Sequence, residues 1–109
     1  MNNSRYVDIR GIWIPGDILA DRTLSFLEKT VLAVIRALGK NKGCFATDMY
    51  LASQLGCTGY EAKLAVTRLC EMGCVSCRRS RDTRILSFIG LPKNPSDLRP
   101  DNIIDLLKQ

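Results

Sequence analysis

The sequence has no histidine and no long run of apolar residues. Histidine is the side chain that most often acts as a general acid or base near neutral pH, and the chain also lacks a glycine-rich phosphate loop and a paired acidic motif. We therefore expect neither an enzyme nor a bound cofactor. No segment approaches the ~20 apolar residues of a membrane span, and the first residues do not resemble a secretory signal. These absences predict a cytoplasmic protein with no membrane partner.

The composition is that of one globular domain. The chain has 109 residues, of which 46% are hydrophobic and 25% are charged, so it can bury a core without a disulfide or a metal. The net charge of +5 favours an anionic partner. The excess of positive charge is densest in residues 58–84, which contain six basic and three acidic residues.

The five cysteines suggest a zinc site as one alternative. Cys74 and Cys77 form a CxxC motif, and Cys57 and Cys70 would complete a four-cysteine set. A CxxC motif on an extended strand, however, points its two thiols to opposite faces of the strand. We therefore expect reduced cysteines that pack as small apolar residues, and no metal.

A helix is predicted over residues 26–38. Ser25 and Glu28 have the spacing of a capping box, in which each side chain bonds the backbone N–H of the other residue. Gly39 is expected to end this helix in a left-handed conformation. Before the helix, an apolar extended segment should stop at Pro15 and turn through Gly16–Asp17. One apolar face is expected along the helix, formed by Leu27, Val31, Val34, Ile35 and Leu38.

Residues 47–90 have the most informative order of elements. A short helix capped by Thr47 should end at Gly56, and a second capping box at Thr58 and Glu61 should open the helix 59–72. A strand, an arginine-rich hairpin tip over RRSRDTR and a second strand follow. Residues 44–45 are expected to add a brief strand.

The string LASQLGCTGYEAKLAVTRLCEMGCV with the basic hairpin resembles the winged helix-turn-helix superfamily. The resemblance implies a mainly α fold with a small β-hairpin wing (α+β), a three-helix core and a C-terminal tail. The winged domain would span residues 1–90, including the N-terminal extended segment, and residues 91–109 would form a linker and a short helix. The upstream segment IWIPGDILADRTLSFLEKTVLAVIRAL and the GCFAT string are similar to helix-turn-helix domains of bacterial plasmid and phage replication initiators and mobile-element regulators. The scaffold positions that match the superfamily are Leu51, Ala52, Leu55, Gly56, Cys57, Thr58, Ala62, Val66, Leu69 and Gly73.

The resemblance implies that the protein binds double-stranded DNA in replication initiation or in transcription regulation on a mobile element. The recognition helix 59–72 would enter the major groove, and the wing 78–84 would contact the backbone or the minor groove. The helix departs from strong DNA readers at Gly59, Glu61 and Leu64, which are poor phosphate contacts. The DNA-binding residues carried over are Thr58, Tyr60, Lys63, Thr67, Arg68, Arg78, Arg79, Arg81 and Arg84.

Two questions stay open at the level of sequence. The same fold also serves as a protein–protein interaction module or adaptor with little DNA binding of its own, in which case Tyr60 and Leu64 would form an apolar contact. The apolar residues of the tail either fold back on the domain or meet a second copy, and we expect a homodimer through residues 98–109. A replication or transcription protein is a further expected partner.

Overall fold

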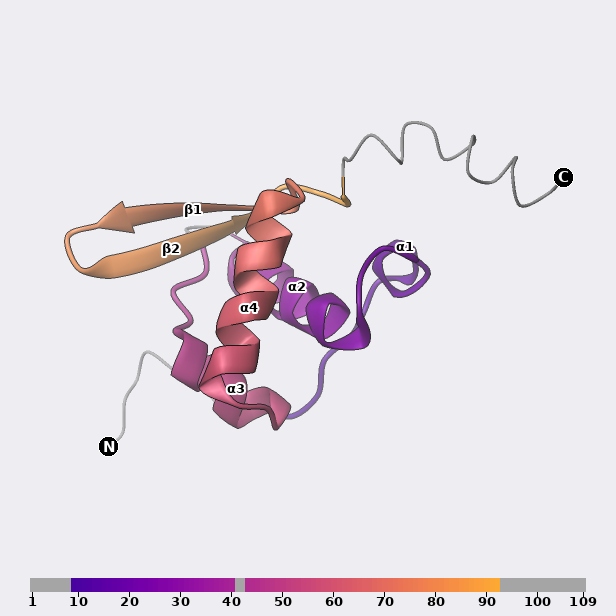
Figure 1. Cartoon of the computed structure of the whole chain (residues 1–109), viewed down its shortest axis with the longest axis horizontal. Helices are drawn as coiled ribbons and strands as arrows, with labels where there is room; N and C mark the ends of the chain where they lie inside the picture. Colours follow the sequence, from indigo (N-terminus) through magenta and orange to yellow (C-terminus); the bar gives the residue numbers. More distant parts are fainter. Residues whose placement is uncertain (1–8, 41–42, 93–109) are drawn as a thin grey trace, which may run out of the picture.

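The computed structural model describes residues 9–40 and 43–92 as an α+β arrangement (Figure 1). Four helices and one antiparallel hairpin follow one another within these residues. This order is compatible with the winged-helix arrangement that the sequence predicts. None of the helices in the described part of the chain has the length and apolar character needed to cross a membrane. The elements are α1 (Gly16–Leu19), α2 (Phe26–Leu38), α3 (Asp48–Leu55), α4 (Gly59–Glu71), β1 (Val75–Ser80) and β2 (Thr83–Phe88).

Residues 9–15, which precede α1, belong to no helix or strand, and the turn expected at Gly16–Asp17 is wrong. These residues instead begin the one-turn helix α1. Pro15 precedes the helix with a φ of −56°, and its carbonyl oxygen accepts hydrogen bonds from the N–H groups of Ile18 at 3.0 Å and Leu19 at 2.9 Å. Because a proline φ suits the start of a helix, the chain coils directly after Pro15 and buries Ile18.

The helix α2 begins with the predicted capping box. The N–H of Glu28 donates to the Ser25 hydroxyl at 3.1 Å, and the N–H of Ser25 donates to the Glu28 carboxylate at 2.9 Å. The left-handed end expected at Gly39 is wrong, because its φ is −104°. Glycine is needed there for close approach: a Cβ atom would lie 2.9 Å from both the backbone N of Cys44 and the carbonyl O of Ile35.

The core lies where α4 packs against α2 and α3. Small residues such as Ala52, Ala62 and Ala65 are buried in it, which lets the helices approach closely. In Figure 1 the helix α4 lies in front of α2, and α3 joins α4 below. The largest fully buried side chains are Ile18, Leu32, Ile35, Leu51, Leu69 and Leu86.

The hairpin is longer and its turn is tighter than the sequence predicts. β1 and β2 pair in register from Val75 opposite Phe88 to Ser80 opposite Thr83, so the turn has only Arg81 and Asp82 at its centre. The brief strand expected at residues 44–45 is reduced to a single bridge, in which Cys44 and Leu86 exchange two backbone hydrogen bonds of 2.7 and 2.8 Å. This bridge ties the hairpin to the loop before α3.

The described chain ends close to the core. Leu91 packs against the core, and Pro92 is buried. The expected linker, the short C-terminal helix and the homodimer contact through residues 98–109 lie outside the described residues, apart from the first two residues of the linker.

Candidate nucleic-acid interface

The turn between α3 and α4 has the geometry that the sequence predicts. Gly56 has a φ of +73°, a conformation that L side chains rarely adopt, and its N–H donates to the carbonyl of Ala52 at 2.9 Å. Thr58 then caps α4, since its hydroxyl accepts the N–H of Glu61 at 3.0 Å. The turn is therefore short, and the two helices are held at a fixed angle by residues of the turn itself.

The first turn of α4 already has a carboxylate. The Glu61 side chain accepts the N–H of Thr58 at 2.9 Å, which completes the second predicted capping box. An anion approaching this helix end therefore meets a negative charge as well as the helix dipole. Thr58 itself is exposed, and its hydroxyl hydrogen can still be donated to a phosphate.

The outer surface of α4 divides into two flanks. Tyr60, Lys63 and Thr67 follow one another at spacings of three and four and are all exposed. Tyr60 is 68% exposed. In the part of the chain that the structure describes, the side chains of these three residues form no hydrogen bond or ion pair within the protein. They are available to an external partner.

Lys63 lies on the flank of α4 that faces the hairpin. Cys70, seven residues later and so on the same side of the helix, lies close to Cys77 of β1. Burial raises the pKa of the Cys70 thiol above its ordinary value, and the neighbouring Cys77 raises it further. Lys63 therefore lies on the same side of α4 as Cys70, about two turns nearer the start of the helix.

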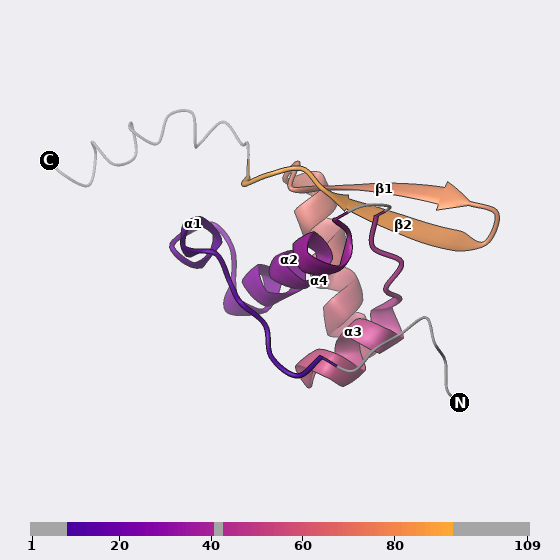
Figure 2. The same cartoon turned by 180° about the vertical axis from the view of Figure 1, so that it is seen from behind.

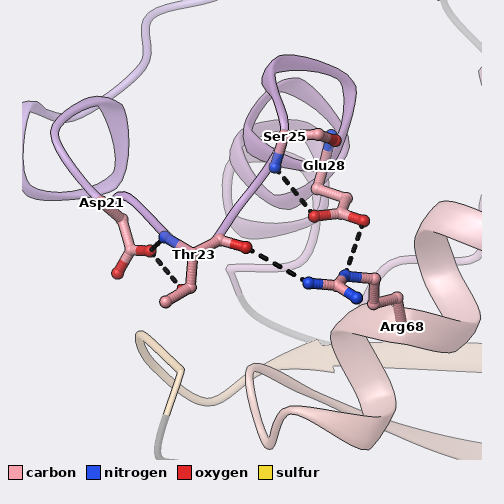
Figure 3. A network of polar contacts seen from close by, with 5 residues as sticks. All are labelled: Asp21, Thr23, Ser25, Glu28 and Arg68. Carbon is pink, nitrogen blue, oxygen red and sulfur yellow. Dashed lines mark hydrogen bonds and ion pairs between the residues drawn. The ribbon is translucent and has the colours of Figure 1, made fainter. Parts of the chain in front are cut away.

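Arg68 lies on the opposite flank and has partners inside the protein (Figure 3). Its Nε atom lies 2.9 Å from a carboxylate oxygen of Glu28, and its Nη2 donates to the carbonyl of Thr23 at 3.3 Å. The other Glu28 oxygen caps α2 at Ser25. Asp21 in turn accepts the N–H of Thr23 at 2.8 Å. Arg68 therefore fastens α4 to the start of α2.

The same flank is lined by acids. A hollow of about 500 Å³ between α2 and α4 includes the carboxylates of Glu28, Glu61 and Glu71 in its lining, with Arg68 as its only cation. Leu64 and Thr67 also lie along it, so Thr67 of the outer stripe borders this acidic side. A DNA phosphate has little to bind on this side of α4.

The hairpin presents three exposed arginines. Arg78, Arg79 and Arg81 are exposed, and none of them has an ion-pair partner within residues 9–40 and 43–92. Because neighbouring residues of a strand point to opposite faces, Arg78 and Arg79 leave β1 on opposite sides. Figures 1 and 2 show that the turn with Arg81 and Asp82, between β1 and β2, lies at the far end of the hairpin from the helices. The three guanidinium groups thus surround an element that projects from the body.

Arg81 has a φ of +61° and is the only non-glycine residue with a positive φ in the described chain. This region disfavours side chains with a Cβ atom, and glycine or asparagine is the usual occupant. The hairpin therefore holds an arginine where a glycine would be less strained. A positive φ at the first central residue is the usual geometry of a two-residue hairpin turn.

Arg84, the fourth predicted arginine of the wing, is held inside the protein. Its Nη1 lies 2.8 Å from Asp48 Oδ1, its Nη2 donates to the carbonyl of Ala46 at 2.7 Å, and its side chain is only 16% exposed. It connects β2 to the start of α3. Sequence reasoning did not identify this contact or that of Arg68, because each joins residues far apart in the chain.

The four cysteines of the zinc alternative do not gather around a common point. Cys74 is buried, Cys57 and Cys70 are partly buried, and Cys77 is exposed rather than buried as a small apolar residue. In the described ranges no three histidine, cysteine, aspartate or glutamate residues come together in a group that could hold a metal ion.

The candidate interface therefore consists of the outer stripe of α4 and the hairpin. Of the nine residues predicted to bind DNA, Arg68 and Arg84 are bound within the protein, and Thr58 is partly used as a cap. The other six are exposed: Tyr60, Lys63, Thr67, Arg78, Arg79 and Arg81. Comparisons of the chain with protein-family models, with curated proteins and with solved structures found no match.

Proposed function

We propose that this protein is a winged helix-turn-helix protein that binds double-stranded DNA. In this proposal α4 enters the major groove, and the hairpin 78–84 acts as the wing and contacts the backbone or the minor groove. The observation that carries the proposal is the set of three exposed arginines without internal partners, on a hairpin directly after two helices joined by a tight turn.

The wing supplies most of the affinity in this proposal. Arg78 and Arg79 point to opposite faces of β1 and Arg81 stands at the turn, so the hairpin can contact phosphates on both of its sides. Arginine at a hairpin tip also suits a narrow minor groove, where the negative potential is enhanced. Lys63, on the neighbouring flank of α4, extends the same positive surface.

The helix α4 supplies the base contacts. Lys63 can donate to guanine O6 and N7, and Thr67 can bond several base edges or contact the thymine methyl group. Tyr60 can donate its hydroxyl to a phosphate or pack against the sugar. The exposed stripe of α4 has few hydrogen-bond donors. We therefore expect strong binding to the DNA backbone and only modest discrimination between base sequences.

The biological role that we propose is replication initiation or transcription regulation on a mobile element. It rests on the resemblance of the upstream helix and the GCFAT string to replication initiators of plasmids and phages. Two protomers bound to one duplex would occupy half-sites about one helical turn apart (~34–36 Å).

A second candidate function is favoured by the apolar side chains near the tight turn. Met49, Tyr60 and Leu64 are large and exposed, and Met49 lies close to the backbone of Gly59 at the start of α4. Exposed apolar residues that lie together are typical of a protein contact. In this alternative the protein is an interaction module or adaptor with weak DNA binding.

Fluorescence anisotropy with labelled duplexes, including DNA from the protein's own locus, separates the two functions. For DNA binding, we expect Arg79→Ala plus Arg81→Ala to weaken binding strongly. The matched control is Arg10→Ala plus Arg22→Ala, which removes the same charge from exposed positions outside the interface and should have little effect. Equal losses in both variants would show attraction by net charge alone and would contradict the proposed interface.

A further inference from the structure

A large apolar hollow lies on the side of the protein away from α4. It has a volume of about 510 Å³ and runs between the segment 9–15 and the second half of α2. Figure 2 shows that segment and α2 on the near side, with α4 behind them. The side chains that line it include Ile9, Ile12, Trp13, Val34, Ala37 and Leu38.

Two large apolar side chains at the hollow remain exposed to solvent. Trp13 is 77% exposed and Leu38 is 47% exposed, although Ile12 and Ile14 beside Trp13 pack against the core and Ile35 beside Leu38 is buried. A concave surface with exposed large apolar side chains usually meets a partner. The proposed DNA interface does not use it.

We propose that residues 98–109 of the same chain cover this hollow, with Ile103, Ile104, Leu106 and Leu107 against Trp13 and Leu38. The first argument is chemical. Residues 98–109 contain four large apolar residues in the run 103–107, with Asp101 and Asp105 beside them and the bases Arg99 and Lys108 further out on either side. The lining of the hollow contains two cations, Arg36 and Lys40, and no acid.

The second argument is the reach of the chain. Phe88 of β2 lies 4.9 Å from the guanidinium carbon of Arg36, which belongs to the lining of the hollow. Leu91 then packs on the core. Residues 93–99 can span ~23 Å when extended at ~3.3 Å per residue, so the apolar part of the tail can return to α2 of its own protomer.

Trp13 provides a direct reporter, because it is the only tryptophan of the chain. We expect Ile104→Asp plus Leu107→Asp, made in the full chain, to shift the Trp13 emission to longer wavelength and to increase its quenching by acrylamide. The matched control is Ser96→Asp plus Asn102→Asp, which adds the same charge to polar positions of the tail and should change neither quantity. Leu38→Asp, on the exposed rim of the hollow, should have the same effect as the tail variant.

The mass of the protein in solution shows whether the tail that covers the hollow belongs to the same protomer or to a second copy. We expect light scattering to give one protomer at concentrations where Trp13 is protected, and the protection to persist on dilution. A mass of two protomers with protection that is lost on dilution would overturn the proposal in favour of a second copy. Trp13 that is equally exposed in the full chain, the tail variant and the control would overturn it altogether. Neither result bears on DNA binding, since the hollow lies away from α4 and the hairpin.

Discussion

Arg79 and Arg84 lie directly opposite each other in the hairpin register, yet they have different surroundings. Arg84 turns to Asp48 at 2.8 Å and to the carbonyl of Ala46 at 2.7 Å. Arg79 is exposed and has no ion pair in the described part of the chain. Two like charges placed opposite each other normally destabilise a hairpin, and the Asp48 carboxylate compensates one of them. One arginine of the pair thus holds the hairpin to α3 while the other remains available to a partner.

Replacing Arg84 by alanine should therefore lower the stability of the protein, whereas replacing Arg79 by alanine should lower its affinity for DNA. Arg84→Ala removes a charged hydrogen-bond network and should lower the free energy of unfolding by about 1.5–3 kcal/mol. Arg79→Ala should change that free energy by less than about 0.5 kcal/mol and should weaken duplex binding. Urea denaturation and anisotropy on the same two proteins check this. A stable Arg84→Ala variant that loses DNA binding would contradict the division of roles.

Arg68 should behave as a structural residue rather than as a DNA contact. Its side chain is 52% exposed, so solvent screens its ion pair with Glu28, and we expect Arg68→Ala to lower the free energy of unfolding by only about 1 kcal/mol. A double-mutant cycle with Glu28→Gln, which keeps an acceptor for the Ser25 N–H, should give a coupling of about 0.5–1 kcal/mol. Lys63→Ala is the control on the other flank of α4. It should leave the stability unchanged and weaken binding to duplex DNA.

The tip of the hairpin should show a conflict between stability and binding. Arg81 has a φ of +61°, which glycine adopts without strain, so Arg81→Gly should raise the free energy of unfolding by about 0.5–1 kcal/mol. The same variant removes a guanidinium group from the wing and should bind duplex DNA more weakly. Thermal denaturation and anisotropy measure the two effects. If Arg81→Gly is more stable and binds DNA as well as the unsubstituted protein, the tip has no part in binding.

Burial raises the pKa of the Cys44 thiol, with smaller opposing effects from the backbone of Ala46 and from Arg84. In the unfolded chain this thiol ionises near its ordinary pKa of ~8.5, while in the folded protein it stays protonated to higher pH. The stability due to this difference is present below the unfolded pKa and is lost as the pH rises toward the folded one. Under reducing conditions we expect the free energy of unfolding to fall between pH ~8.5 and 10, and to fall less in Cys44→Ala. If the free energy of unfolding falls equally in the unsubstituted protein and in Cys44→Ala, the pH dependence comes from groups other than Cys44.

Structural features formed by residues close together in the sequence could be predicted from the sequence. Both capping boxes, at Ser25 and Thr58, were predicted because their partners lie three residues apart. The end of the first of the two helices at Gly56 was also predicted, because glycine commonly ends a helix. At the candidate interface, the exposed residues of α4 and of β1 were predicted by carrying positions over from the family resemblance.

The contacts that remove Arg84 and Arg68 from the proposed DNA surface could not be predicted in this way. Arg84 meets Asp48 from 36 residues away, and Arg68 meets the carbonyl of Thr23 from 45 residues away. Their side chains are indistinguishable from free cations until the packing of the helices is known. The sequence does not predict the one-turn helix α1, because a proline after an apolar segment indicates a stop, whereas the Pro15 carbonyl accepts the first hydrogen bonds of this helix.

The salt dependence of duplex binding tests the central claim most directly. If the wing binds phosphates, the logarithm of the association constant should fall linearly with the logarithm of salt concentration, by about 0.9 for each phosphate that is neutralised. Arg79→Ala plus Arg81→Ala should then make the slope shallower by about 1.8, while Arg10→Ala plus Arg22→Ala should leave it nearly unchanged. No binding at ~50 mM salt to any duplex, or a slope that the wing variant leaves unaltered, would contradict DNA binding through this hairpin.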